Sequence, residues 1–515
     1  MQKKEQHIRA GLTVAVMTML SRVFGLVRDM CFAWFLGAGQ TTDIFFIAFK
    51  IPNFFRRLFA EGAFAQSFVP VLTEYKEHHT LAELKSFISA TASSLSMILL
   101  VFTLLVVMCS QWISYLFAPG FMDDPEKMHV ISHALQITFP YLFFIALTAF
   151  MSSILNVYQH FMLPSLAPLI LNLCLISTVF LTVYTDQPVL ALSWSVFLAG
   201  LLQLFLQVPL LLRMKLFPVF TYHFWKSWKN PGVKKVITLM LPTLFAVSVT
   251  QLSLLIDTVL ASFLIPGSIS WLYYADRLVE LPLGILAIAI ATVILPSLSK
   301  KYQHKDSTAF TETLNWAIRL VLFMGLPAAL ALMTLADTMI NTLFGYRAMT
   351  LADINQTASA LRAYSLGLIA FMLIKVLAPA YFAQQNTKTP VKIGVTASIT
   401  NILLSLLLIM PLAHSGLALA TSLAAMLNAA LLAYGLWRRN VLSVVKSQMV
   451  YYARVTGSSL IMVAVIWVMS QYLFFHTDGD MLIRWFYLLL YCMTGIVVYL
   501  MAAHVLGIRK GDLVA

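Results

Sequence analysis

The chain has 515 residues, of which 60% are hydrophobic and only 11% are charged, and its mean hydropathy is +0.85. Soluble domains carry about 25% charged residues, and no single core could bury this much apolar material, so the composition excludes a soluble protein. The formal net charge of +13 does not indicate a nucleic-acid partner, because cytoplasmic loops of membrane proteins collect Lys and Arg. We therefore expect an all-α polytopic membrane protein.

Apolar segments long enough to cross a bilayer follow one another along the whole chain. A helix needs about 20 apolar residues to cross a hydrocarbon core of about 30 Å. This criterion predicts about fourteen transmembrane helices, at residues 11–36, 41–70, 86–117, 131–157, 163–184, 189–212, 236–264, 270–298, 310–343, 356–383, 391–412, 416–437, 450–474 and 482–506. The basic N-terminal segment leads into the first of these helices without a small-residue cleavage site, so we expect it to be retained.

The Lys and Arg residues between these segments lie almost entirely on alternate loops. The opposite loops hold only Lys127, Arg347 and Arg484. The positive-inside rule therefore predicts that both termini are cytoplasmic, which agrees with an even number of spans.

The sequence repeats itself weakly at a separation of about 226 to 230 residues. Lys50-Ile51-Pro52 matches Glu280-Leu281-Pro282, for example, and Pro164 with Asn172 matches Pro390 with Asn401. This separation predicts two pseudo-symmetric six-helix lobes of the same orientation, with the binding site between them. The predicted parts are an N-terminal lobe at 1–212, a basic cytoplasmic linker at 213–235, a C-terminal lobe at 236–437 and a C-terminal helix pair at 438–515.

Charged side chains lie inside several expected helices, where each costs at least about 2.5 to 3.5 kcal/mol. Arg319, Arg362 and Arg454 are expected to reach toward the interface. The others gather on the first, second, eighth and tenth helices, and they are the cations Arg22, Arg28, Lys50, Arg56, Arg57, Arg277 and Lys375 and the acids Asp29, Asp43, Glu61, Asp276 and Glu280. Arg22 shares a helix face with Asp29, so part of this set is expected to pair. The surplus of cations predicts an anionic substrate, and arginine forks suit a diphosphate.

Gly25, Pro52 and Pro282 interrupt the expected helices at the depth of these charges. Interrupted helices are tolerated in membranes mainly where they line a cavity, so the breaks favour a binding site. The alternative is that the two prolines only kink their helices for packing.

Several motifs of catalytic and metal-binding proteins are missing from the sequence. No G-x-x-x-x-G-K-[ST] loop is present. Asp123-Asp124 is typical of a solvated turn, and His129 and His133 lack an evident third metal ligand. The four cysteines have no paired spacing that would indicate a disulfide framework or a zinc site. A transporter is therefore favoured over an enzyme.

Several runs closely resemble the MurJ (MviN) family of bacterial lipid II flippases. These runs are residues 21–29 (SRVFGLVRD), 37–39 (GAG), 42–43 (TD), 49–63 (FKIPNFFRRLFAEGA), 273–282 (YYADRLVELP), 295–299 (LPSLS) and 375–379 (KVLAP). The resemblance extends over nearly the whole chain. It implies the fold of the multidrug/oligosaccharidyl-lipid/polysaccharide exporter superfamily, with two six-helix lobes around a central cationic cavity and a groove for the lipid tail at the last two helices.

The resemblance and the charge pattern together predict a set of substrate-binding residues. They are Arg22, Arg28, Ala33, Asp43, Lys50, Asn53, Arg56, Arg57, Glu61, Arg277, Glu280 and Lys375. Ala33 is implied as a small residue at the cavity portal. Some family members bind a sodium ion, and the resemblance implies Asp257, Asn401 and Thr421 as its ligands here, although Ser405 stands where a second acid is expected.

The expected function is that of a lipid II flippase in the bacterial cytoplasmic membrane. By alternating access it would move the undecaprenyl-diphosphate-linked peptidoglycan precursor from the inner to the outer leaflet. No cofactor is expected apart from a sodium ion or the membrane potential. The expected partners are lipid II, membrane lipids and the cell-wall synthesis machinery. The alternative is a drug or cation antiporter of the same superfold, for which an acidic cavity is expected.

Overall fold

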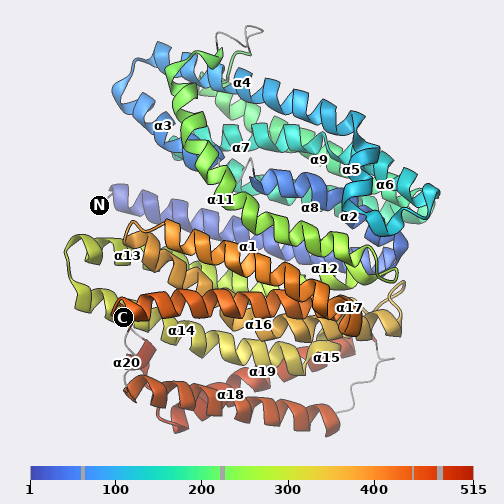
Figure 1. Cartoon of the computed structure of the whole chain (residues 1–515), viewed down its shortest axis with the longest axis vertical. Helices are drawn as coiled ribbons and strands as arrows, with labels where there is room; N and C mark the ends of the chain where they lie inside the picture. Colours follow the sequence, from blue (N-terminus) through green and yellow to red (C-terminus); the bar gives the residue numbers. More distant parts are fainter. Residues whose placement is uncertain (1, 59–63, 221–226, 443–445, 473–479, 514–515) are drawn as a thin grey trace. The chain divides into compact units, whose positions relative to one another are not determined.

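The computed structural model describes residues 2–58, 64–220, 227–442, 446–472 and 480–513. Within these ranges every regular element is a helix, which confirms the predicted all-α class (Figure 1). Contacts divide the chain into two compact units, Met1–Gly267 and Ser268–Ala515, called unit 1 and unit 2 below.

Unit 1 contains long helices joined by short connections. Its elements are α1 (Gln2–Leu36), α2 (Gln40–Arg56), α3 (Phe64–His78), α4 (Leu81–Met108), α5 (Ser110–Phe117), the short 3₁₀ turn η2 (Pro119–Phe121), α6 (Pro125–Thr138), α7 (Tyr141–Val157), α8 (Met162–Leu181), the 3₁₀ turn η3 (Thr182–Tyr184), α9 (Pro188–Arg213) and α11 (Pro231–Ala261).

Unit 2 contains the remaining helices. They are α12 (Ser268–Pro282), the π-helical turn η4 (Leu283–Ala287), α13 (Ile288–Gln303), α14 (Ser307–Thr334), α15 (Ala336–Leu343), α16 (Leu351–Ala383), α17 (Lys388–Arg438), α18 (Lys446–Tyr472), α19 (Met481–Val505) and α20 (Lys510–Leu513). α17 is broken at Ala413, whose φ of 49° lies outside the helical region. This break separates the two segments predicted at 391–412 and 416–437.

Helix occupies every predicted apolar segment within the described ranges. Among the described residues, nine helical segments are long and apolar enough to cross a membrane. α1, α2 and α12 are not in this group. α2 and α12 have only 17 and 15 residues, and all three helices carry charged side chains of the predicted site. The count of fourteen spans stays a prediction.

The structure repeats at a constant separation along the chain. α4 begins at Leu81 and α14 at Ser307, which is 226 residues later, and the starts of α5 and α15, α6 and α16, and α8 and α17 are separated by the same number. The preceding N-cap residues are related in the same way. Thr80 accepts a hydrogen bond from the third backbone N–H of α4, and Asp306 accepts the corresponding bond in α14. The repeat predicted from weak sequence matches is therefore also a repeat of helix boundaries.

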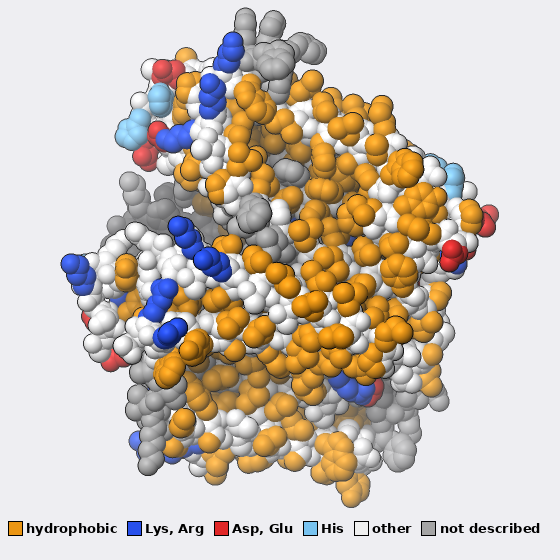
Figure 2. Space-filling model, in the orientation of Figure 1, with side chains coloured by type: hydrophobic (Ala, Val, Ile, Leu, Met, Phe, Trp, Pro, Cys, Tyr) orange, Lys and Arg blue, Asp and Glu red, His pale blue; other side chains and the backbone are white. Residues whose placement is uncertain are grey.

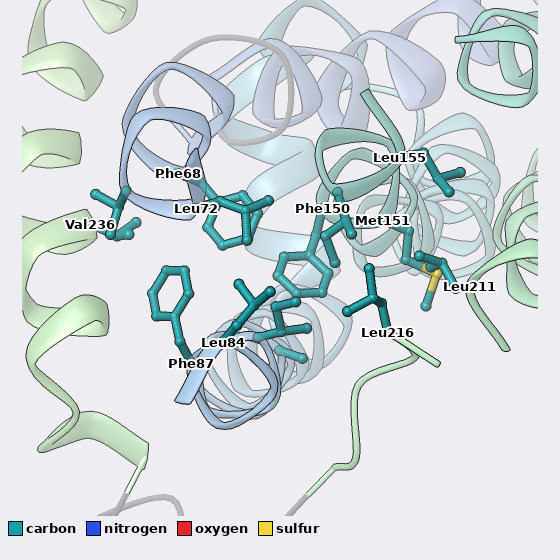
Figure 3. Packing of buried hydrophobic residues seen from close by; sticks show 14 of the residues in the cluster. Phe68, Leu72, Leu84, Phe87, Phe150, Met151, Leu155, Leu211, Leu216 and Val236 are labelled. Carbon is teal, nitrogen blue, oxygen red and sulfur yellow. The ribbon is translucent and has the colours of Figure 1, made fainter. Parts of the chain in front are cut away.

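Unit 1 has a large hydrophobic core where α3 meets α4. Phe68, Phe87 and Phe150, from α3, α4 and α7, are buried there with Leu211 of α9 and Val236 of α11 (Figure 3). The start of α11 approaches so closely that a Cβ atom on its second residue, Gly232, would lie 2.5 Å from the Phe87 ring. This packing explains why contacts group α11 with unit 1.

The compact units and the predicted lobes divide the chain at different places. The predicted C-terminal lobe starts at 236, whereas unit 2 starts at Ser268. The lobes describe sequence repeats, and the units describe packing in one conformation, so the lobe boundaries stay a prediction.

In unit 2, the C-terminal pair α18 and α19 packs on α14. Phe323 of α14 shares a buried cluster with Tyr451 and Tyr499, and the Tyr499 hydroxyl donates to the Phe323 carbonyl at 2.6 Å. A hydrogen bond also joins the start of α18 to the end of α19. Arg454 Nη1 donates to the Gly507 carbonyl at 3.0 Å.

Within each unit, the two kinds of surface are separated along the helices. Figure 2 shows hydrophobic side chains over the middle of the visible helices, whereas Lys and Arg gather mainly toward their left ends. This distribution is typical of a membrane protein whose basic loops lie on one side.

Candidate functional site

Arg28 is held by two polar partners inside unit 1. It lies on α1 and is only 4% exposed. Its Nη2 and Nε atoms donate to Oδ1 of Asp29 at 2.7 and 2.9 Å, and its Nη1 atom donates to Oδ1 of Asn172 on α8 at 3.0 Å. Asn172 Nδ2 donates to the Ser21 carbonyl at 3.1 Å. The guanidinium carbon also lies 5.7 Å from the centre of the Phe32 ring. The positive charge of Arg28 is therefore balanced within the fold.

Asp29 pairs with Arg28, not with Arg22 as the shared helix face suggested. Arg22 is half-buried and belongs to none of the ion pairs among the described residues. The prediction that Gly25 interrupts this helix is wrong, because α1 is continuous from Gln2 to Leu36. A glycine costs about 1 kcal/mol in a helix, and the packing of α1 on α8 outweighs this cost.

The cations of α2 contact neutral groups. Lys50 Nζ donates to Thr258 Oγ1 of α11 at 3.2 Å, and Arg56 Nε donates to Asn53 Oδ1 at 2.7 Å. These two contacts orient the cations. α2 then widens into a π-type turn at Arg57 and Leu58, a geometry that is common at functional sites.

Asp43 connects the start of α2 to the segment that follows α11. It is 1% exposed, and its Oδ2 atom accepts a hydrogen bond from the backbone N–H of Gly267 at 2.6 Å. Gly267 has a φ of 99°, a conformation that glycine adopts without a steric penalty. The predicted cavity acid is therefore engaged with the backbone in this conformation.

In unit 2, Arg277 makes local contacts within α12. Its Nη1 atom lies 2.8 Å from Glu280 Oε2, and Nη2 donates to the Tyr273 hydroxyl at 3.1 Å. The guanidinium also lies 5.1 Å from the centre of the Tyr273 ring. α12 ends at Pro282, where the π-helical turn η4 begins. The helix therefore changes from α to π geometry after Pro282 without a non-helical gap, and α2 continues through Pro52, so the interruption predicted at Pro52 is wrong.

The other predicted site residues have differing surroundings. Ala33 is fully buried in unit 1, with 0% exposure, whereas Lys375 on α16 is exposed in unit 2. Glu61 lies outside the described residues. Of the predicted sodium ligands, Asp257 belongs to unit 1 and Asn401 and Thr421 belong to unit 2. Among the described residues, no group of three His, Cys, Asp or Glu side chains could hold a metal ion.

Three contacting residues were not predicted from the sequence. Asn172, Thr258 and Tyr273 each bind a predicted cation. Asn172 did carry a signal, because it is a polar residue in an apolar segment and recurs as Asn401 in the repeat. Nothing in the sequence connects it with Arg28, which is 144 positions away.

The sequence of this chain matches a known protein family. The sequence model of the family described as "Lipid II flippase MurJ" matches residues 32–487. The chain belongs to the lipid II flippase MurJ family. This family membership and the apolar helices together indicate a multi-pass protein of the bacterial inner membrane.

Individual relatives match nearly the whole chain. A protein of Vibrio cholerae named "Probable lipid II flippase MurJ" is 44% identical over 469 residues, which is 89% of each chain. A solved structure titled "Lipid II flippase MurJ, inward closed conformation" has a TM-score of 0.82 and 28% identity, and the match covers 96% of this chain and 98% of that one. An inward-facing multidrug resistance MATE family transporter has a TM-score of 0.66 and 14% identity, covering 84% of this chain and 98% of the other, and shares the fold alone.

Proposed function

We propose that the protein is a lipid II flippase, which moves the lipid-linked peptidoglycan precursor from the inner to the outer leaflet. The observation that carries this proposal is the family match over residues 32–487, together with relatives of that name over most of the chain. A flippase is a transporter, and the reaction leaves the covalent structure of its substrate unchanged. The cationic side chains on α1, α2 and α12 supply the chemistry that the diphosphate requires.

The diphosphate binds by replacing internal partners of the arginines. Arg28 and Arg277 are each bound to a carboxylate, Asp29 and Glu280 respectively. A diphosphate oxygen is a comparable acceptor for a guanidinium fork, so capture exchanges one acceptor for another. The same carboxylates recover the arginines when the substrate leaves. Substrate release therefore does not require an uncompensated cation in a low-dielectric environment.

Alternating access requires bonds that exist in one conformation and break in another. The bond from Gly267 to Asp43 joins α2 to the end of the α11 segment, and we assign it to one of the two states. A ligand that binds one state more tightly shifts the population toward that state. The fold shared with the MATE transporter supports this type of mechanism.

The orientation follows from the basic residues. Lys and Arg gather at one end of the helices in each unit (Figure 2), and the positive-inside rule assigns that end and both termini to the cytoplasm. The diphosphate would then be captured from the cytoplasmic leaflet. The C-terminal pair α18 and α19 would supply the groove for the lipid tail.

A sodium ion and the membrane potential are the proposed driving forces. Asp257, Asn401 and Thr421 offer a carboxylate, an amide and a hydroxyl oxygen, and a hard cation prefers such oxygen donors. This donor set fits sodium chemically. Moving one charge through 100 mV is worth about 2.3 kcal/mol. The cell-wall synthesis machinery is the proposed partner that consumes the exported precursor.

A cellular assay of lipid II tests this function. Accessible lipid II at the outer face is measured after depletion of the protein and after restoration with wild type, Arg277→Ala or Arg362→Ala. Arg362 is a matched control, because it pairs with Asp337 on the surface of unit 2. Wild type and Arg362→Ala should restore accessibility, and Arg277→Ala should not. Normal accessibility in depleted cells would contradict the proposal. A changed drug tolerance as the only effect of depletion would also contradict it, because loss of an antiporter has that effect.

A further inference from the structure

A polar cavity lies in unit 2 where the end of α13, the start of α14, the end of α16 and the end of α17 meet. Its volume of about 550 Å³ falls within the range of about 300–1,000 Å³ that is typical of ligand pockets. None of the predicted substrate-binding residues or sodium ligands lines it. We call it the helix-end cavity. It is a candidate binding site that the proposed transport function does not use.

Three residues that line the helix-end cavity have an uncommon backbone conformation. Lys305, Gln385 and Asn440 follow the ends of α13, α16 and α17, and their φ angles are 57°, 57° and 56°. Each donates its backbone N–H to the carbonyl three residues earlier, which closes the helix. Glycine is the usual residue at this position, because a side chain is strained there.

This strain is concentrated at one place in the fold. Among the described residues, seven residues other than glycine have a positive φ, and three of them line the helix-end cavity. The helices could end with glycine at all three positions, but the cavity would then lose a lysine, a glutamine and an asparagine side chain. Strained residues cluster at binding sites. The three side chains therefore indicate a ligand.

The charges of the cavity favour an anionic group. Lys305 and Arg439 line it, and neither belongs to an ion pair found among the described residues. The Arg439 guanidinium lies 5.5 Å from the centre of the ring of Tyr381, a buried side chain of α16 that helps to position it. Asp306 is the only acid in the described lining, and its Oδ1 atom already accepts the backbone N–H of Ala309 at 2.9 Å.

The neutral side chains of the cavity favour a ligand with a planar ring. Tyr302 is 47% exposed, and its ring packs edge to face on buried Phe310, with 6.4 Å between the ring centres. An exposed aromatic face of this kind can stack on a nucleic-acid base. Amide side chains both donate and accept hydrogen bonds, as the edge of a base requires. Four amides line the cavity, namely Gln303, Gln384, Gln385 and Asn440.

We propose that the helix-end cavity binds a nucleoside diphosphate, with Lys305 and Arg439 at the phosphates and Tyr302 against the base. Two cations suit two phosphate groups, and arginine suits phosphate oxygens especially well. The connection from α13 to α14 lies at the left of Figure 1, on the side where Figure 2 shows Lys and Arg side chains. The positive-inside rule assigns this end to the cytoplasm. The proposal does not depend on whether the protein flips lipid II.

Calorimetric titration of the purified full-length protein in detergent tests this site. The ligands are ADP, UDP and inorganic pyrophosphate, which has the charge but no base. Both nucleotides should bind, and pyrophosphate should bind about fivefold or more weakly because it lacks the stacking contact. Tyr302→Ala should lower the affinity for ADP by a similar factor and leave that for pyrophosphate unchanged.

The strained positions provide a variant that separates binding from folding. Lys305→Gly removes a cation but relieves the backbone strain, so it should keep the melting temperature while weakening ADP about tenfold or more. Lys215→Gly is the matched control. Lys215 follows the end of α9 in the same conformation, with a φ of 56°, and it does not line the cavity. Likewise, Arg439→Gln should weaken ADP about tenfold, and the neighbouring Arg438→Gln should bind as wild type does.

Four results would overturn the proposal. They are the absence of ADP and UDP binding to wild type, equal affinity for ADP and pyrophosphate, unchanged ADP affinity in both Lys305→Gly and Arg439→Gln, and an equal loss in the two control variants. A hexaglutamate peptide tests the other class of anionic ligand. Displacement of ADP by this peptide at equal concentration would show a docking site for acidic protein segments and would also overturn the proposal.

Discussion

Two ion pairs of the proposed transport site differ in how far the fold encloses them. Arg28 and Asp29 in α1 are 2.7 Å apart, and their side chains are 5% and 0% exposed. Arg277 and Glu280 in α12 are 2.8 Å apart, but their side chains are 33% and 40% exposed. Arg28 also hydrogen-bonds Asn172 on another helix, whereas Arg277 also hydrogen-bonds Tyr273, one turn away on the same helix.

This difference in exposure predicts that the Arg28 pair stabilises the fold, whereas Arg277 is accessible to a ligand. Removing one partner of a buried pair leaves the other charge in a low-dielectric environment, which is strongly destabilising, whereas an exposed pair contributes little. A diphosphate that takes the place of Glu280 reaches a guanidinium that is already partly exposed. To reach Arg28 it must also open the contact between α1 and α8. We therefore assign early contact with the substrate to Arg277, and contact during a change in helix packing to Arg28.

Arg28→Ala should have the largest effect on stability. It removes the cation that binds the buried Asp29 carboxylate, so the free energy of unfolding should fall by about 3–5 kcal/mol. The thermal melting temperature of the purified protein in detergent measures this loss. Combining Arg28→Ala with Asp29→Ala should recover much of it, because neither buried charge remains. A single variant as stable as wild type would show that the pair is not enclosed as described.

Asn172→Ala should have an intermediate effect. It removes the acceptor of one Arg28 hydrogen bond and the donor to the Ser21 carbonyl, which predicts a loss of about 1–3 kcal/mol. The same melting assay checks this value. Ala167→Ser, at another buried position of α8, controls for general disturbance of the helix. An equal effect of both variants would show that Asn172 has no special connection with Arg28.

Arg277→Ala should change stability little while abolishing transport. Its pair with Glu280 is about one-third exposed, so solvent screening limits the loss to about 1 kcal/mol or less. Melting temperature and lipid II accessibility are measured on the same variant. A large loss of stability would remove the contrast with Arg28, and retained transport would exclude Arg277 from substrate capture.

The exposed pair of Lys235 and Glu74 joins α11 to α3 and should give the smallest effect. The hydrogen bond from Lys235 lowers the pKa of Glu74 below its ordinary value of 4.5. A lowered pKa contributes stability above the ordinary value, and this stability is lost as the pH falls through the lowered pKa. The small difference in melting temperature between wild type and Lys235→Met should therefore be present at neutral pH and shrink below pH 4.5. A difference that grows on acidification would contradict this assignment.

The sequence predicted the helices better than their side-chain contacts. Hydropathy located the helical segments because about 20 apolar residues are needed to cross a membrane, and the 226-residue repeat survives in the helix starts. The partner of Asp29 was not predictable from helix faces. Adjacent residues point about 100° apart, yet the long Arg28 side chain folds back to its neighbour while Asn172 holds its other end.

Other features depend on packing that no local pattern encodes. Gly25 remains helical because α8 supports α1 along its length. α11 groups with unit 1 because its start packs on Phe87 and its end lies beside Lys50. Arg319 was expected to reach the interface from near a helix end. Its buried Nε atom was not foreseen, because the pattern of one helix does not show which distant residues pack around it.

Lipid II accessibility in cells that carry the double variant Arg28→Ala with Asp29→Ala tests the central claim most directly. The variant removes the cation and its carboxylate together, so a folded protein should remain in the membrane. The account predicts that the variant is folded and present at the wild-type level, but that accessible lipid II stays as low as in depleted cells. Accessibility restored to the wild-type level would show that Arg28 serves only the fold, and would contradict capture of the diphosphate by exchange with Asp29.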